Sequence, residues 1–205
     1  MNRALIAGLT GQTGAGKSTV GEVFRQEGFA VIDCDRVSRE VTYPGGECLR
    51  TLVNLFGGSI QNGDGSLNRR ALGAIVFSDK DQLKRLDQAI FPFITAQIRM
   101  EIAALEAKGA KAVLLDAPTL FESGADVLCE KIVSVTADPQ LRLKRIRERD
   151  GLTEEEGKRR MASQLDETYF RAHSDFVMEN NGTHPELVEQ ARRVAQVLRE
   201  YANGN

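Results

Sequence analysis

Short apolar runs alternate with helical patterns in the first and last parts of the chain. Residues 4–10 form an apolar run that ends in a glycine-rich turn, and residues 18–26 then place apolar side chains at a helical spacing. A second apolar run, residues 29–32, stops at acidic residues, and two more lie at 112–115 and 131–135. This alternation of strand and helix patterns predicts an α/β fold with a parallel sheet.

The last third of the chain carries three signals for the start of a helix and one further strand pattern. The helix signals share a polar residue that can cap free backbone N–H groups, and they are Asp138 with Pro139, Thr153 with Glu156, and Thr183 with Glu186. Residues 176–178 form a short apolar run. We therefore expect three more helices and a final strand.

Residues 36–108 differ from their surroundings in having long helical patterns and few strand-like runs. Leucine and isoleucine recur at spacings of three and four between residues 83 and 105, which predicts an amphipathic helix whose apolar stripe is core. Pro92 interrupts the stripe and predicts a kink or a restart, because proline removes a helical hydrogen bond. We expect a mainly helical insertion in one compact unit with lobes.

Composition narrows the classes of protein that fit. The chain has 205 residues, 41% hydrophobic and 27% charged, as in a globular domain with a real core. Its 27 Lys and Arg nearly balance 29 Asp and Glu, which argues against a nucleic-acid or anionic-membrane binder. Three cysteines without C-x-x-C spacing and two histidines favour a reducing compartment and no zinc site. We expect a cytoplasmic protein without a membrane span, and nothing indicates an obligate protein partner.

Residues 11–18 match the phosphate-loop pattern G-x-x-x-x-G-K-[ST] at every fixed position. Glycines let the backbone wrap so that N–H groups point at phosphate oxygens, and the following helix adds its positive end. Lys17 would contact the β- and γ-phosphates, and the Ser18 hydroxyl would ligate Mg²⁺. The alternative is a glycine-rich turn with an incidental Lys-Ser pair. We predict that a nucleoside triphosphate binds to Gly11, Gln12, Thr13, Gly14, Ala15, Gly16, Lys17, Ser18 and Thr19.

Three carboxylates follow predicted strands. Asp33 and Asp35 are two positions apart, so their side chains should project to the same side, where ligands of open α/β sheets bind. One could accept a proton from an attacking hydroxyl while the other holds a magnesium-bound water. We favour Asp35 as the base, and capping of the next helix is the alternative. Asp116 has the position of a Walker-B carboxylate, which holds Mg²⁺ through water, or else of a turn former.

A helix rich in arginine follows the predicted Asp138 cap. Arg142, Arg145 and Arg149 share one face of it, because they stand at i, i+3 and i+7. Planar guanidinium groups suit a transferring phosphoryl group, whose developing charge they offset. The alternative is a solvated face balanced by the acidic residues 154–156. Residues 147–171 contain few large apolar side chains and are typical of a mobile lid.

In combination these features resemble the dephospho-CoA kinase family over residues 8–182. The shared motifs are residues 8–11, 16–19, 33–35, 39–41, 44–45, 56–57, 64–65, 76–77, 115–118, 120–122 and 180–182, with Leu67, Arg69, Leu72, Pro92, Arg145, Arg149, Gln164 and Asp175. The departures are Gln12 for a usual Gly, Phe91 for a usual His, Thr119 for Leu, Cys129-Glu130 for Val-Asp, and Arg142 for Gln.

The resemblance implies an α/β P-loop NTPase three-layer fold in a single domain. Its parts are a core (about 1–35, 110–140 and 174–205), a helical acceptor-binding insertion (about 36–109) and a helical lid (about 147–171). It further implies ATP, Mg²⁺ and transfer of a phosphoryl group to the ribose 3′-hydroxyl of dephospho-CoA, giving coenzyme A and ADP in the last step of coenzyme A synthesis. The implied catalytic residues are Asp35, Lys17, Arg145, Arg149 and Asp33, and residues 180–182, with Asn180 and Gly182, would lie near adenine.

Two other functions fit the phosphate loop. Another P-loop kinase, such as one for a nucleoside monophosphate, is possible, although the helical insertion is large for such an acceptor. A non-enzymatic nucleotide-binding switch belongs to a different class. Against a switch, the chain has no N-K-x-D motif, and Asp116 is followed by Ala-Pro-Thr where a switch has D-x-x-G.

Overall fold

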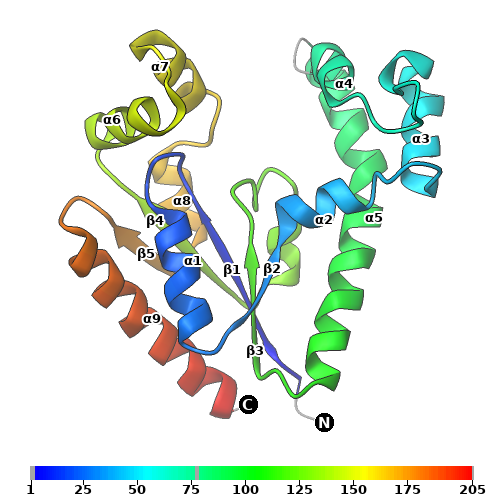
Figure 1. Ribbon diagram of the computed structural model, residues 1–205. Coiled ribbons are helices and arrows are strands. Elements are labelled where there is room, and N and C mark those ends of the chain that lie inside the picture. Colours follow the sequence, from blue (N-terminus) through cyan, green and yellow to red (C-terminus); the bar gives the residue numbers. More distant parts are fainter. Residues whose placement is uncertain (1–2, 77–78, 205) are drawn as a thin grey trace. The chain divides into compact units, whose positions relative to one another are not determined.

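The computed structural model describes residues 3–76 and 79–204. Phe77, one of the residues that carry the family resemblance, lies outside this part of the chain. The described residues form two compact units, one from Met1–Ile32 with Ala104–Asn205 and the other from Asp33–Ala103. Figure 1 shows the elements of both, and each unit is described by itself.

The first unit is built on a five-stranded sheet with the order β2-β3-β1-β4-β5. The strands are β1 (Leu5–Gly11), β2 (Ala30–Asp33), β3 (Ala112–Asp116), β4 (Lys131–Thr136) and β5 (Phe176–Glu179). Strand β1 pairs in parallel with β3 and β4, and β4 pairs in parallel with β5. All five predicted strands are confirmed, each within a residue or so at its ends. The order places β1, which leads into the phosphate loop, at the centre of the sheet.

The helices of this unit are α1 (Lys17–Gln26), α6 (Pro139–Asp150), α7 (Glu154–Ala162), α8 (Glu167–His173) and α9 (His184–Gly204), with a short 3₁₀ helix, η2 (Ala125–Leu128). The three with predicted caps, α6, α7 and α9, begin where those caps predict. Asp138 caps α6, and Thr153 forms the expected capping box with Glu156. At α9 the Thr183 N–H donates to the Glu186 carboxylate at 2.7 Å. Helix α8 has no counterpart in the sequence patterns.

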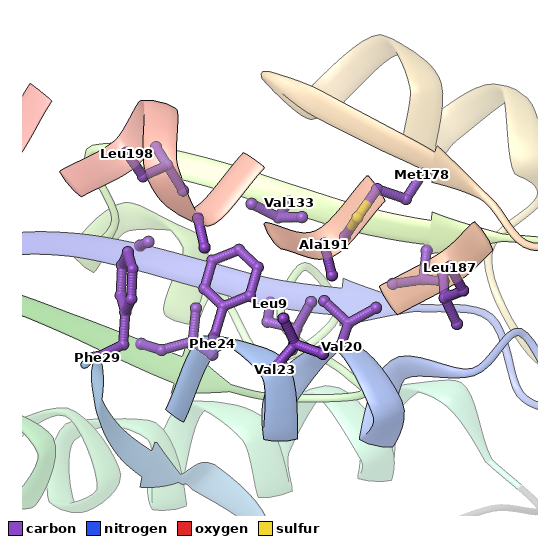
Figure 2. Close-up of a cluster of buried hydrophobic side chains, with 14 of the residues drawn as sticks. Leu9, Val20, Val23, Phe24, Phe29, Val133, Met178, Leu187, Ala191 and Leu198 are labelled. Carbon is purple, nitrogen blue, oxygen red and sulfur yellow. The ribbon is translucent and has the colours of Figure 1, made fainter. Parts of the chain in front are cut away.

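Helices α1 and α9 cover one face of the sheet (Figure 1). Figure 2 shows Phe24 of α1 and Leu198 of α9 over the strand residues Leu9 and Val133. These side chains are buried, as expected where strands and helices both present apolar faces. Gly8 lies between Ala7 and Leu9 on β1, which belong to this cluster, so it faces the other side of the sheet. A Cβ added at Gly8 would lie 2.7 Å from Leu120.

The segment after β3 therefore packs on the opposite face of the sheet from α1 and α9. Helix α8 contacts β4, and Phe170, its fully buried side chain, anchors it. The two helices, the sheet and these covering segments form the three layers that the resemblance implies for the core. No helix among residues 3–76 and 79–204 is long and apolar enough to cross a membrane.

The second unit is mainly helical, as predicted for the insertion. It contains α2 (Cys34–Glu40), α3 (Glu47–Phe56), the 3₁₀ helix η1 (Gly58–Ile60), α4 (Arg69–Val76) and most of α5 (Lys80–Ala107). Its core is formed by Cys48, Leu52, Ile60, Leu72 and Val76, against which the first part of the predicted α5 stripe packs.

Helix α5 does not restart at Pro92, because it is one continuous helix of 28 residues. Ile90 and Phe93 on either side of the proline both pack against the core of the unit. This packing stabilises the helix through a position where one backbone hydrogen bond is missing. The restart that the sequence allowed is therefore wrong.

Candidate active site

The phosphate loop joins β1 to α1, and two of its glycines have backbone conformations that other residues rarely adopt. Gly14 has φ +77° and Gly16 has φ +105°. A Cβ at Gly16 would also lie 2.5 Å from the Asn180 side chain. The motif therefore needs glycine here both for the turn and for close packing beneath it.

Side chains hold the loop carbonyls from outside. The carbonyls of Thr13, Gly14 and Ala15 accept hydrogen bonds from Arg142 (3.0 Å), Arg145 (3.4 Å) and Asn180 (2.7 Å), respectively. The N–H groups of Gly14 and Gly16, by contrast, donate to no acceptor in the described part of the chain. Backbone amides left unpaired at a helix N-terminus form a binding site for anions such as phosphate.

Lys17 and Asp116 meet at the start of α1. Lys17 is the first residue of this helix, and its Nζ forms an ion pair with the Asp116 carboxylate at the end of β3. The pairing of β1 with β3 places Asp116 beside Leu9 of β1. A Cβ on Gly21 would lie 3.3 Å from Asp116 Oδ2, so the carboxylate packs against α1. The structure thus brings the predicted Walker-B carboxylate to the phosphate loop.

The donor set at this point fits a magnesium ion. Ser18 is exposed in the first turn of α1, and Asp116 pairs with Lys17 of the same turn, so a hydroxyl and a carboxylate are available there as oxygen ligands. Among the residues that the structure describes, no group of three or more His, Cys, Asp and Glu side chains could hold a metal. A site with few protein ligands suits Mg²⁺, which is usually bound by one or two carboxylates together with substrate phosphates.

The predicted row of arginines divides into two parts. Arg142, which is only 4% exposed, and Arg145 both bond to the loop, and Arg145 also donates to the Asn180 carbonyl at 3.1 Å. Burial lowers the pKa of Arg142, but a guanidinium group stays charged at neutral pH. Arg149 instead makes two 2.7 Å hydrogen bonds to Asp150, which raises the pKa of Arg149.

Of residues 180–182, Asn180 supports the loop. Asn180 is buried, its N–H donates to the Thr136 carbonyl at 2.8 Å, and its side chain lies beneath the loop. The Asn181 side chain accepts from the Asp138 N–H at 2.7 Å. A Cβ at position 182 would meet the Glu186 carboxylate, which is the end of a flexible side chain.

Two side chains that contact the loop, Arg142 and Gln164, are not among the site residues that the resemblance implies. Gln164 accepts a hydrogen bond from the Thr13 N–H at 2.7 Å. Spacing along the chain gave no signal for either contact, because the partners come from elements far apart in sequence. The family resemblance includes Gln164 but assigns it no role.

Asp33 and Asp35 belong to the helical unit, at its first residues. Asp33 is the N-cap of α2, and its carboxylate accepts a hydrogen bond from the Arg36 N–H at 3.0 Å. For Asp33, the alternative that the acidic residues cap the next helix is therefore confirmed. Asp35 is exposed in the first turn of α2. Within this unit Arg36 also donates to Glu101 of α5 at 2.6 Å, which fixes α2 and with it the backbone of Asp35.

Replacing Asn180 with alanine should weaken ATP binding about threefold to tenfold, because the Ala15 carbonyl loses a hydrogen bond worth about 0.5–1.5 kcal/mol. Isothermal titration calorimetry measures the change. The control is Asn181→Ala, which removes a similar hydrogen bond that does not involve the loop. An unchanged Kd for ATP in folded Asn180→Ala would show that this side chain does not position the loop.

Comparisons with known proteins cover nearly the whole chain. The sequence model for dephospho-CoA kinase matches residues 5–186. A protein of Geobacillus kaustophilus named dephospho-CoA kinase is 37% identical over 197 residues, 96% of each chain. Two similar solved structures are TT1252 from Thermus thermophilus (TM-score 0.80, 33% identity, covering 97% of this chain and 98% of that one) and a dephospho-CoA kinase from Campylobacter jejuni (TM-score 0.68, 27% identity, 98% of each). The similarity therefore includes both units.

Proposed function

We propose roles for the site residues from the premise that this chain belongs to the dephospho-CoA kinase family. The chain has the P-loop kinase fold and is an ATP-dependent kinase that phosphorylates the ribose 3′-hydroxyl of dephospho-CoA, the last step of coenzyme A synthesis. The comparisons do not favour a nucleoside monophosphate kinase or a nucleotide switch. The individual roles below are our proposal.

The phosphate loop binds the triphosphate of ATP. The observation that carries this assignment is the unpaired N–H groups of Gly14 and Gly16, in a loop whose carbonyls are held from outside. The remaining loop residues, from Gly11 to Thr19, give the backbone its path. When ATP binds, the Lys17 ammonium would leave its ion pair with Asp116 and contact the β- and γ-phosphates.

Magnesium accompanies the nucleotide in this proposal. Ser18 would hold the ion through its hydroxyl, and Asp116 would hold it through a water molecule. When bound, Mg²⁺ neutralises charge on the β- and γ-phosphate oxygens. Once Lys17 turns to the phosphates, the Asp116 carboxylate is available to hold that water.

Asp35 is the general base. It accepts the proton of the ribose 3′-hydroxyl as that oxygen forms a bond to the γ-phosphorus and the bond from phosphorus to the ADP oxygen breaks. Asp33 supports this step by capping α2, the helix that carries Asp35. Arg145 and Arg149 offset the developing charge. A guanidinium group has five N–H donors, so Arg145 can contact phosphate while it holds the loop.

The helical unit, about residues 36–109, would bind the acceptor, and residues 147–171 would form a lid that excludes water. Within the helical unit a groove of about 370 Å³ is lined mostly by apolar side chains, among them Tyr43, Phe93 and Met100, and also by Glu40, Glu47 and Gln97. It suits the apolar part of dephospho-CoA. Cys48 also lines it, and burial raises the pKa of this thiol to about 11, so the thiol stays neutral beside a ligand at pH 7.

We place the reaction in the cytoplasm as part of the same proposal. Cys34, Cys48 and Cys129 are present as thiols. Thiols persist in compartments that are kept reducing, whereas secreted domains of similar size usually contain disulfides.

A coupled assay of ADP formation tests the proposal. ADP should form with Mg-ATP and dephospho-CoA together, stop when EDTA removes the metal, and resume when Mg²⁺ is added in excess. AMP in place of dephospho-CoA is the control acceptor. If the rate of ADP formation did not change with dephospho-CoA but increased with AMP, the assignment of the acceptor would be contradicted. Full activity in EDTA would contradict the role of the metal.

A further inference from the structure

The connection between α7 and α8, residues 163–166, reaches the phosphate loop through one side chain. Gln164 Oε1 accepts a hydrogen bond from the Thr13 N–H at 2.7 Å, although the two residues are 151 positions apart. On the other side of Thr13, Arg142 Nε donates to the carbonyl at 3.0 Å. Both polar groups of the Thr13 backbone are therefore held by side chains from outside the loop.

The connection that carries Gln164 is itself held in place. The Gln164 N–H donates to the Met161 carbonyl at the end of α7, at 3.3 Å. Two residues later Asp166 caps α8 through the Tyr169 N–H at 2.8 Å. Helix α8 is in turn anchored by Phe170, which is fully buried. Gln164 is thus the point at which the proposed lid helix α7, the anchored helix α8 and the phosphate loop are joined.

The neutral carboxamide suits this position. A glutamate could accept the same hydrogen bond, but it would bring a negative charge into a loop whose free N–H groups face an anion. A shorter side chain would not span the distance to Thr13. A hydrogen bond that fixes a partly buried backbone amide removes conformational freedom that binding would otherwise have to remove.

We infer that Gln164 is a positioning residue for nucleotide binding, because its carboxamide fixes the Thr13 amide and links the phosphate loop to the α7–α8 connection. This role rests on the proposed function, in which the loop binds ATP. Gln164 acts through Thr13 and is not a catalytic residue. Its loss should therefore change the affinity for ATP and leave the affinity for dephospho-CoA unchanged.

Two variants remove the contact in different ways. Gln164→Met keeps the length of the side chain without an acceptor, and Gln164→Asn keeps the polarity but is shorter. In the nucleotide-free protein, amide hydrogen exchange followed by NMR should become about threefold to tenfold faster at Thr13 in both variants, as for the loss of one hydrogen bond. The KM for ATP should rise by a similar factor, with kcat and the KM for dephospho-CoA within twofold of wild type.

Gln140→Met is the matched control, because Gln140 is an exposed glutamine of α6 that lines the same 530 Å³ groove as Gln164. It should change neither Thr13 exchange nor the KM for ATP. Folded Gln164 variants with wild-type Thr13 exchange or a wild-type KM for ATP would overturn the inference while leaving the kinase assignment intact. Failure of the wild-type protein to bind ATP would instead contradict the proposed function, and the role of Gln164 with it.

Discussion

Replacing Lys17 with alanine should lower kcat/KM for ATP by about 10³-fold or more. The ammonium group is positioned at the start of α1 by its ion pair with Asp116, beside the free amides of the loop. Removing one neutral hydrogen-bond donor that stabilises charge in the transition state lowers kcat by about 10²–10³-fold. Lys17 carries a full positive charge, so its loss should have at least the larger effect. Steady-state assays with Mg-ATP and dephospho-CoA measure the effect.

Lys144→Ala is the control for Lys17→Ala. Lys144 is an exposed lysine of α6 whose ammonium lies 3.9 Å from Glu148, a surface pair of little energetic weight. This variant should keep kcat/KM within about twofold of wild type. If Lys144→Ala lost as much activity as Lys17→Ala, the effect would come from the positive charge of the protein as a whole and not from Lys17 in particular. A folded Lys17→Ala protein with more than a tenth of wild-type kcat/KM would remove Lys17 from the phosphate site.

Asp35→Asn should lower kcat by about 10²–10⁴-fold, the usual contribution of a general base, and change the Kd for ATP by less than about threefold. Asparagine has nearly the same shape but cannot take the proton of the acceptor hydroxyl. The side chain is exposed in the first turn of α2, so the substitution leaves the core of the unit unchanged. Single-turnover kinetics measure the chemical step, and calorimetry measures ATP binding.

The matched variant is Asp33→Asn, because asparagine caps a helix about as well as aspartate. The Arg36 N–H would keep its acceptor, so α2 should stay folded and kcat should fall far less than in Asp35→Asn. Full kcat in Asp35→Asn together with a large loss in Asp33→Asn would move the base to Asp33. Full kcat in both variants would remove the base role from this pair.

Much of the fold follows from local patterns in the sequence. The strands and the caps at Asp138 and Thr153 depend on neighbouring residues, so their signals lie within a few positions. Helix α8 was not predicted, because it is only seven residues long and is stabilised by the burial of Phe170. The continuity of α5 through Pro92 also depends on packing against other elements, which periodicity alone does not reveal.

The candidate site divides in the same way. The phosphate loop was predictable because its pattern encodes its own geometry, in glycines that permit the turn and a lysine at the start of the helix. The side chains that support the loop were not predictable, because they lie far from it in the sequence. Asn180, for example, contacts Ala15 across 165 positions. The arginine row shows the same limit, since one helical face carries Arg145 to the loop while Arg149 turns to its neighbour Asp150.

The supports of the phosphate loop also set the order in which the site can form during synthesis. The loop lies near the N-terminus, whereas Arg142, Gln164 and Asn180 follow far along the chain. A ribosome adds about 5–20 residues per second from the N-terminus, so the motif leaves it many seconds before its last support. The nascent chain carries a complete motif without a complete binding site, and its affinity for nucleotide should rise as its C-terminal segment folds.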